Sequence, residues 1–367
     1  MRGASRSLLL GASLVIVPAI AMGQSVDRAL AGAGGGTVQF HFASRDGVCG
    51  NGRNFYRASD MGIGYFSSYN NGADGDESCA RGPVRVVVVR FGTEIIRIET
   101  YAGPLAQDPD GGKDLGAVSA RDAASWLINQ AATLEGRPAR DAIQPAILAD
   151  SAVVTPQLLR LATDQTRSRD IRSSAISWLA RRREEPGGVG AATVQRTLDG
   201  IVHDRDESET TRRQAMSTLG NLDRGEGVPL LITMAGDADL WVAKTAQMSL
   251  ANSGDPRARQ FIRQAVKRSD LPDDSRASMI RGLGNEYAVG NDYQTLRDLY
   301  PTLDSDQERN AVISALANAG GTANNAWLLA LAKSPTETSG RRRQAVSALS
   351  RNDDPKIREQ LKSLIAP

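Results

Sequence analysis

The strongest constraint on the fold of this 367-residue chain is a pattern that recurs along its last two thirds. The pattern is an Arg, then a small or apolar residue three positions later, then a Leu or Ile four positions after that. Ala replaces the Arg in one copy. The copies are Arg140/Ile143/Ile147, Arg172/Ala175/Leu179, Arg212/Ala215/Leu219, Ala243/Ala246/Leu250, Arg276/Met279/Leu283, Arg309/Val312/Leu316 and Arg342/Ala345/Leu349. Their last residues are 32, 40, 31, 33, 33 and 33 positions apart, which indicates a stack of repeated units.

Each copy has helical spacing, because positions i, i+3 and i+7 share one face of a helix. We call the helix that carries the pattern the anchor helix. A second helix is expected in each interval, and two of these begin with Asp255-Pro256 and Asp354-Pro355. Asp as N-cap with Pro at the first helical position is a strong start signal. One such hairpin cannot bury its apolar face alone, so we predict a mainly α protein in which about seven hairpins stack.

These residues resemble the HEAT and HEAT-like (armadillo-type) repeat family over about residues 120–367. The resemblance rests on Asp-Pro at helix starts, the anchor Arg, the Ala…Leu core, and the acids Asp239, Asp274 and Asp306 before their anchor helices. It implies a right-handed, curved α-solenoid whose second helices line the concave face, and binding far more often than catalysis. The chain departs from the pattern at Ala243 and in an insertion over residues 181–190.

The repeat also assigns a role to its recurring residues. The arginines are expected to pair with acids or to cap carbonyls between adjacent units, and the leucines to be core residues. In the stretch "RRRQAVSAL", Arg342 takes the repeat position, which leaves Arg341 and Arg343 as surface charges. The residues expected to be structural are Arg140, Arg172, Arg212, Arg276, Arg309, Arg342, Leu179, Leu219, Leu250, Leu283, Leu316 and Leu349.

The region before the repeats shows β-strand signals and resembles no family. "TVQFHFAS" alternates, with Val38, Phe40 and Phe42 on one side, while residues 84–91 and 93–101 are expected to form a hairpin with Ile96 and Ile98 on one face. We therefore predict a small antiparallel β domain over residues 24–105, a linker over 106–118 rich in Asp, Gly and Pro, and the solenoid over 119–367.

The first 23 residues have the order of a secretory signal peptide: a basic start, a short apolar run and small residues at the end. Without Arg2 and Arg6, the 44 Lys and Arg become 42 against 42 Asp and Glu, so the remaining chain is nearly neutral. We predict an exported protein, periplasmic or secreted and soluble, with no membrane span and no nucleic-acid partner. In an oxidising compartment Cys49 and Cys79 most simply form a disulfide; a two-Cys metal site is the alternative.

Residues that could support catalysis or hold a metal are scarce. The two histidines, His41 and His203, lie in different regions, and no nucleophile elbow, phosphate loop or dinucleotide motif occurs. We predict no catalytic residue, no metal site and no cofactor. The acidic loops around residues 70–78 and 106–116 are solvated turns or calcium loops. The four Trp residues, Trp126, Trp178, Trp241 and Trp327, and the cluster Tyr287, Tyr293 and Tyr300 are expected to be packing residues rather than ligand platforms.

The leading hypothesis for function is a non-enzymatic scaffold that binds a protein or peptide on its concave face. It rests on the repeat array together with the missing catalytic set. The alternative is a HEAT-like lyase or chaperone-type enzyme, which would need a deep pocket with convergent polar side chains. The sequence names no specific ligand-binding residue for either hypothesis.

Overall fold

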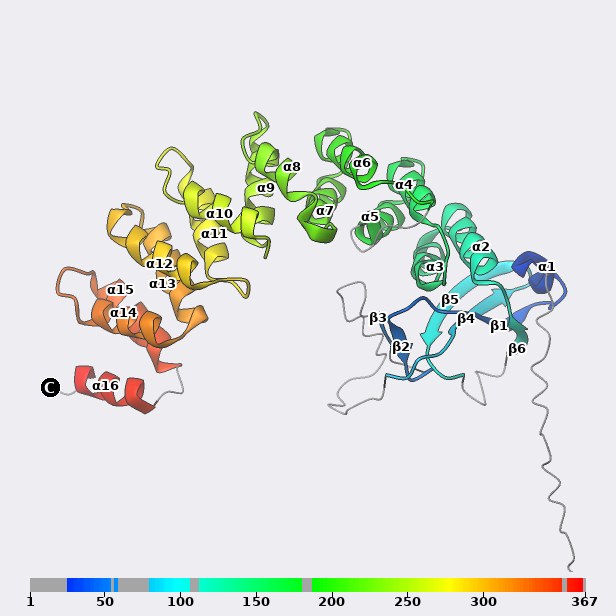
Figure 1. The fold of residues 1–367 in the computed structure, drawn as a ribbon, viewed down its shortest axis with the longest axis horizontal. Coiled ribbons are helices and arrows are strands. Elements are labelled where there is room, and N and C mark those ends of the chain that lie inside the picture. Colours follow the sequence, from blue (N-terminus) through cyan, green and yellow to red (C-terminus); the bar gives the residue numbers. More distant parts are fainter. Residues whose placement is uncertain are drawn as a thin grey trace, which may run out of the picture.

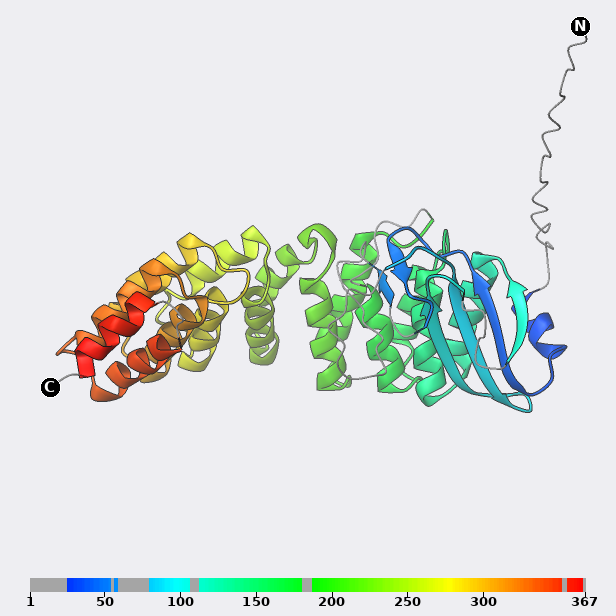
Figure 2. The same cartoon turned by 90° about the horizontal axis from the view of Figure 1, so that it is seen from below.

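The chain forms a curved row of helices with a small sheet at its N-terminal end. The computed structural model describes residues 25–53, 56–58, 79–105, 112–179, 187–351 and 355–365. Figure 1 shows the helices following an arc, with the sheet below α2 and α3 at one end and α16 at the other. Seen from below in Figure 2, the helices stand side by side along the array. The predicted signal peptide and the acidic loop around residues 70–78, with its acids Asp74, Asp76 and Glu77, lie outside the described residues.

Helix pairs account for nearly all of the array. Seven successive pairs, α2/α3 to α14/α15, occur in the described part of the chain, and α16 follows them. This confirms the prediction of a solenoid of about seven helical hairpins. The helices are α1 Val26–Ala31, α2 Ala120–Thr133, α3 Gly136–Leu148, α4 Thr155–Thr163, α5 Arg169–Leu179, α6 Ala191–His203, α7 Glu209–Gly220, α8 Val228–Met234, α9 Leu240–Ala251, α10 Pro256–Ala265, α11 Asp273–Leu283, α12 Gly290–Leu299, α13 Asp306–Ala319, α14 Thr322–Lys333, α15 Ser339–Ser350 and α16 Pro355–Ile365, with 3-10 turns η2 Asp223–Gly225 and η3 Tyr300–Thr302.

The anchor helices are the odd-numbered helices from α3 to α15, and they pack against one another in a continuous row. In Figure 1, α3, α5 and α7 lie nearer the inside of the arc than α2, α4 and α6. The expectation that the second helices line the concave face is therefore wrong. The reason is close packing in the anchor row: a Cβ added at Gly282 would lie 2.5 Å from the Cβ of Ala251, and one at Gly284 would lie 2.5 Å from the Cβ of Ala315. A row of closely spaced helices forms the shorter, inner side of a curve.

The core of the array is built from the residues that the repeat places on its inner helix faces. The six repeat leucines are all buried, and so are Ala175, Ala215, Ala246 and Ala345. In α5, α7, α9 and α15 the buried Ala lies four residues before the buried Leu, so a small and a large side chain lie on the same helix face and neighbouring helices can pack closely. One continuous apolar core runs from the sheet to α16. Among the described residues, no helix combines the length and apolarity needed to cross a bilayer.

The sheet at the N-terminal end has the order β5-β4-β1-β6. Its strands are β1 Gly36–Phe42, β4 Val84–Phe91, β5 Glu94–Ala102 and β6 Lys113–Ala117, and a separate two-stranded ribbon joins β2 Val48–Gly50 to β3 Tyr56–Ala58. The predicted hairpin is present as β4–β5, but a register shift after Val89 interrupts the alternation. Ile96 is consequently exposed whereas Ile98 is buried, so the two do not share a face as predicted.

The predicted linker over residues 106–118 needs correction, because β6 lies within it and pairs in parallel with β1. Residues 106–111 lie outside the described part of the chain. The sheet is therefore mixed rather than purely antiparallel. Its apolar face packs directly on the first hairpin, with Phe40 edge-on to Trp126 at a centroid distance of 5.7 Å. The predicted disulfide between Cys49 and Cys79 is confirmed, and it holds β2 to the segment that precedes β4.

Candidate functional site

Four of the repeat arginines donate to carbonyl groups at the end of the preceding helix or in the segment just after it. Arg172 Nε donates to Ala162 O at 3.3 Å, and Arg212 Nε donates to Val202 O at 2.7 Å. Arg276 Nη1 donates to Arg268 O at 2.9 Å, and Arg309 Nε donates to Leu303 O at 2.6 Å. Ala162 and Val202 lie in the last turns of α4 and α6, where the carbonyls have no partner within the helix, so Arg172 and Arg212 satisfy groups that would otherwise be orphaned. Arg268 and Leu303 lie in the segments that follow α10 and η3, so Arg276 and Arg309 hold those connections instead.

Three of these arginines also contact a carboxylate of the next hairpin. Arg172 pairs with Glu207, and Arg276 Nε lies 2.6 Å from Glu308 Oε1. Arg212 Nη2 lies 3.7 Å from an Asp239 oxygen. Each arginine therefore connects two units, which is a structural role rather than a ligand-binding one.

The first and last copies of the pattern differ from the others. Arg140 is exposed and pairs with the adjacent Asp141. Arg342 forms no side-chain hydrogen bond or ion pair with the described residues, whereas its neighbour Arg341 is nearly buried and contacts both Asp306 of α13 and Glu337. In α15 the bridging arginine is therefore Arg341, one residue before the position that the repeat alignment assigns to it.

The two histidines lie at unrelated places. His41 is on β1, where burial lowers the pKa of its imidazole and the nearby Asp114 carboxylate opposes that change. His203 ends α6, with Nε2 3.1 Å from Asp237 Oδ2 and Nδ1 3.0 Å from Asp199 O. Burial disfavours charge on His203, but the hydrogen bonds and charges of Asp237 and Asp199 outweigh it and raise its pKa.

The pKa of His203 provides a direct test of this contact between repeats. By NMR titration of the full chain we expect a pKa above the ordinary 6.5 for His203 and below it for His41. Because the folded pKa of His203 exceeds the unfolded value, its stabilising contribution is fully present below about pH 6.5 and is lost as the pH rises through the folded pKa. Asp237→Asn should lower the pKa of His203 and leave His41 unchanged. A pKa of His203 that is unaffected by this substitution would contradict the assignment.

The predicted packing aromatics occupy several environments. Trp126 and Trp178 are buried, and Trp327 packs edge-on against the buried Tyr300 at 5.0 Å between centroids. Trp241, on the inner row, is partly exposed, and the Arg212 guanidinium lies over its ring at 4.2 Å. Tyr287 is exposed, contrary to the packing role expected for it.

One groove lies on the inner row, between α7 and α9. Its volume is about 250 Å³, and small polar side chains form much of its lining. The exposed apolar residues Leu240 and Met248 of α9 lie two helical turns apart on one helix face, with exposed fractions of 80% and 38%. Aromatic, Arg and Met side chains are enriched at protein interfaces. The lining residues are Arg213, Ser217, Gly220, Asn221, Thr245, Met248, Ser249, Asn252 and Ser253.

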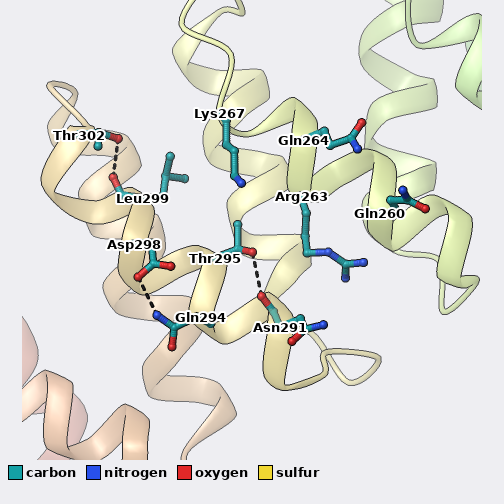
Figure 3. A pocket seen from close by; sticks show the side chains of 10 residues that line it. All are labelled: Gln260, Arg263, Gln264, Lys267, Asn291, Gln294, Thr295, Asp298, Leu299 and Thr302. Atoms are coloured by element: carbon teal, nitrogen blue, oxygen red, sulfur yellow. Dashed lines mark hydrogen bonds between the residues drawn. The ribbon is translucent and has the colours of Figure 1, made fainter.

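A second groove lies between α10 and α12, in the even-numbered row. Its volume is about 700 Å³, and Figure 3 shows side chains of both helices bordering it. The wall from α12 is internally bonded, because Gln294 Nε2 donates to Asp298 Oδ1 at 2.7 Å. The lining is polar and contains no aromatic ring. It consists of Gln260, Arg263, Gln264, Lys267, Asn291, Gln294, Thr295, Asp298, Leu299 and Thr302.

A buried ion-pair network lies beneath this second groove. Asp292 is fully buried, and its carboxylate accepts from Arg259 Nη2 at 2.8 Å and from Arg263 Nη1 at 2.7 Å. Arg259 also donates to Gly282 O at 2.8 Å and to Leu283 O at 3.0 Å, which caps α11. The repeat pattern did not predict this network. The one feature of the sequence that could have indicated it is the position of Arg259, which lies beside the apolar residues of α10. A solvated arginine would not be expected there.

Within the residues that the structure describes, no group of three or more His, Cys, Asp or Glu side chains is arranged to hold a metal ion. Asp114, the one acid of the second predicted calcium loop that lies in a described segment, accepts a hydrogen bond from the Gly116 backbone N–H at 2.8 Å. Among the described residues, the two grooves are the candidate sites considered for ligand binding.

Comparison with known proteins agrees with this architecture. Residues 198–284, which span α6 to α11, match the model of the HEAT repeat family. This stretch of the chain therefore consists of HEAT repeats. Curated proteins provide no match. The N-terminal sheet lies outside the matched segment.

The matching solved structures are distant. Human deoxyhypusine hydroxylase matches with 15% identity over 67% of this chain and 96% of that chain, with a TM-score of 0.29. The complex of CpcE and CpcF of phycocyanin lyase from Nostoc sp. matches with 14% identity over 57% and 86%, with a TM-score of 0.31. A designed armadillo repeat protein matches with 17% identity over 53% and 98%, with a TM-score of 0.29. Likeness at this level supports no inference about function.

Proposed function

We propose that this protein is an exported, non-enzymatic scaffold that binds a protein or peptide partner on the concave face of its repeat array. The observation that carries the proposal is the inner groove between α7 and α9. Met248 and the cation Arg213 line it, and the Arg213 guanidinium lies 5.9 Å from the ring centroid of the partly exposed Trp241. The exposed apolar Leu240 lies beside Trp241 at the start of α9. Trp and Arg dominate the binding energy of many protein interfaces, and apolar anchors usually lie near the interface centre.

The disulfide between Cys49 and Cys79 supports the exported location, because such bonds persist in oxidising compartments. The basic start and apolar run of residues 1–23 support it from the sequence. Cell fractionation together with mass measurement of the isolated N-terminus tests export directly. Recovery of the chain from the cytosolic fraction with its first residues still attached would contradict this part of the proposal.

The test of the binding face is capture from envelope extract on the immobilised full chain at physiological salt. We expect a specific partner whose recovery falls at least about tenfold with the double substitution Leu240→Asp/Met248→Asp, because buried apolar anchors would be replaced by charges. The matched control is Phe91→Asp, which makes the same kind of change at an exposed residue of the β4–β5 hairpin. Equal recovery with both variants, or no specific partner, would contradict the proposal.

The enzyme alternative makes a different prediction for the same experiment. If the chain is a lyase or chaperone-type enzyme, the captured molecule should leave it with an altered covalent structure or an altered conformation. Mass spectrometry and limited proteolysis of the captured molecule, before and after contact with the chain, distinguish the two functions.

A further inference from the structure

The cations of α10 and the residues just after it differ in how they are neutralised. Arg257 pairs with Asp255 at 2.7 Å, and Arg268 pairs with Asp270 at 2.6 Å. The ammonium group of Lys267, by contrast, has no hydrogen bond or ion pair with any described residue. Lys267 borders the groove between α10 and α12 (Figure 3). The groove therefore contains a positive charge that no described residue pairs with.

Arg263 adds to this excess of positive charge. It shares the buried Asp292 carboxylate with Arg259, and Nη1 makes the only hydrogen bond of the Arg263 guanidinium to a described residue. The groove and its floor thus hold three cations, Arg259, Arg263 and Lys267, against the two carboxylates Asp292 and Asp298. One of these carboxylates, Asp298, already accepts a hydrogen bond from Gln294. This balance favours an anionic ligand.

The spacing of the two groove cations suits an extended peptide. Arg263 lies in the last turn of α10, and Lys267 lies in the turn that follows, where its backbone N–H donates to Gln264 O at 3.2 Å. Four residues of such helical turns rise by about 6 Å. Alternate side chains of an extended chain lie about 6.6–6.8 Å apart. Gln260, Gln264 and Asn291 border the same groove, and their amide groups can both donate and accept, as peptide groups require. None of the described residues that line the groove is aromatic, so they provide no stacking platform of the kind that sugar rings commonly use.

We propose that the groove between α10 and α12 binds an extended acidic peptide segment with carboxylates at alternate positions, which Arg263 and Lys267 recognise. The site lies in the even-numbered row, apart from the inner groove between α7 and α9. It is therefore independent of the concave-face function, and its failure would leave that proposal unaffected.

The test uses the full chain and a fluorescein-labelled peptide of sequence Ser-Glu-Ser-Glu-Ser, with binding followed by fluorescence anisotropy. We expect saturable binding that weakens as salt is raised, because partly exposed charges are screened. The Ser-Gln-Ser-Gln-Ser peptide should bind at least about tenfold more weakly, and so should the acidic peptide to the Lys267→Glu variant. Lys267 is exposed, and circular dichroism verifies that the variant remains folded.

The matched control is Arg268→Glu, which reverses the adjacent charge outside the groove and should change the affinity less than about twofold. Three results would overturn the proposal: equal binding of the acidic and amide peptides, equal loss with Lys267→Glu and Arg268→Glu, or no binding of the acidic peptide. Tighter binding of an oligogalacturonate, which carries carboxylates on sugar rings, would also overturn it and would assign the groove to acidic glycans.

Discussion

Replacing Asp292 with Asn is expected to lower the free energy of unfolding by about 3–5 kcal/mol. The Asp292 carboxylate is fully buried and accepts from two guanidinium groups and from the backbone N–H of Val289 at 2.9 Å. Asparagine has nearly the same shape but carries no charge. The variant would therefore leave the positive charge of Arg259 buried without compensation, and this penalty exceeds the loss of the hydrogen bonds themselves.

Urea unfolding of the full chain followed by circular dichroism measures this loss. The matched control is Asp298→Asn, which removes an exposed carboxylate from the same helix. We expect the control to change the stability by less than about 1 kcal/mol. A difference between the two variants of less than about 1 kcal/mol would show that the network does not stabilise the array. Hydrogen exchange should place the loss in α10 to α12, because repeat units mainly stabilise their neighbours.

The helical part of the fold was predictable because its information is local and repeated. The spacing of Ala175 and Leu179, or of Ala215 and Leu219, specifies a buried helix face within one unit. Because the pattern occurs in seven copies, a departure in one copy does not obscure it. Asp255 illustrates the same point for helix boundaries. Its side chain accepts from the Arg257 backbone N–H at 2.8 Å, as the Asp-Pro signal predicts.

The features that were predicted incorrectly depend on contacts between distant segments. "KDLGA" (residues 113–117) has neither alternation nor β-branched residues, and it becomes a strand only because β1 offers a free edge beside it. The direction of curvature depends on which helix row packs more closely, and this becomes visible only where Gly282 meets Ala251. No local pattern in the sequence contains either relation.

The candidate grooves could not be predicted from the sequence either. Asp292 lies 33 residues from Arg259, about one repeat period, and nothing in the pattern marks it as the buried partner. The exposed residues of α7 and α9 form a groove only because their helices are neighbours in the inner row. The repeat pattern identifies which residues are inside, but it does not specify which exposed residues converge.

The second large effect is expected at Arg276, which the repeat pattern did identify as structural. Its guanidinium contacts Glu308 through Nε at 2.6 Å and Nη2 at 2.7 Å, and Glu308 is nearly fully buried. Burial raises the pKa of the Glu308 carboxyl, and Arg276 offsets this only in part, while the charges of Asp273 and Asp304 add to it. Arg276→Met should therefore destabilise the folded chain by about 3–5 kcal/mol near neutral pH, because it leaves a buried carboxylate unpaired.

This loss should depend on pH, and its sign follows from the pKa of Glu308. In the variant the folded pKa rises further above the ordinary value of 4.5, so the folded state retains its proton more strongly than the unfolded state. The contribution of the protonated group to stability is then fully present below about pH 4.5 and is lost as the pH rises through the folded pKa. The deficit relative to the unmodified chain should shrink as the pH is lowered from about 8 to about 5. Arg342→Met is the control, and because Arg342 bridges no described carboxylate it should cause little loss at either pH. A deficit at Arg276 that is the same at both pH values would show that its role is packing rather than neutralising Glu308.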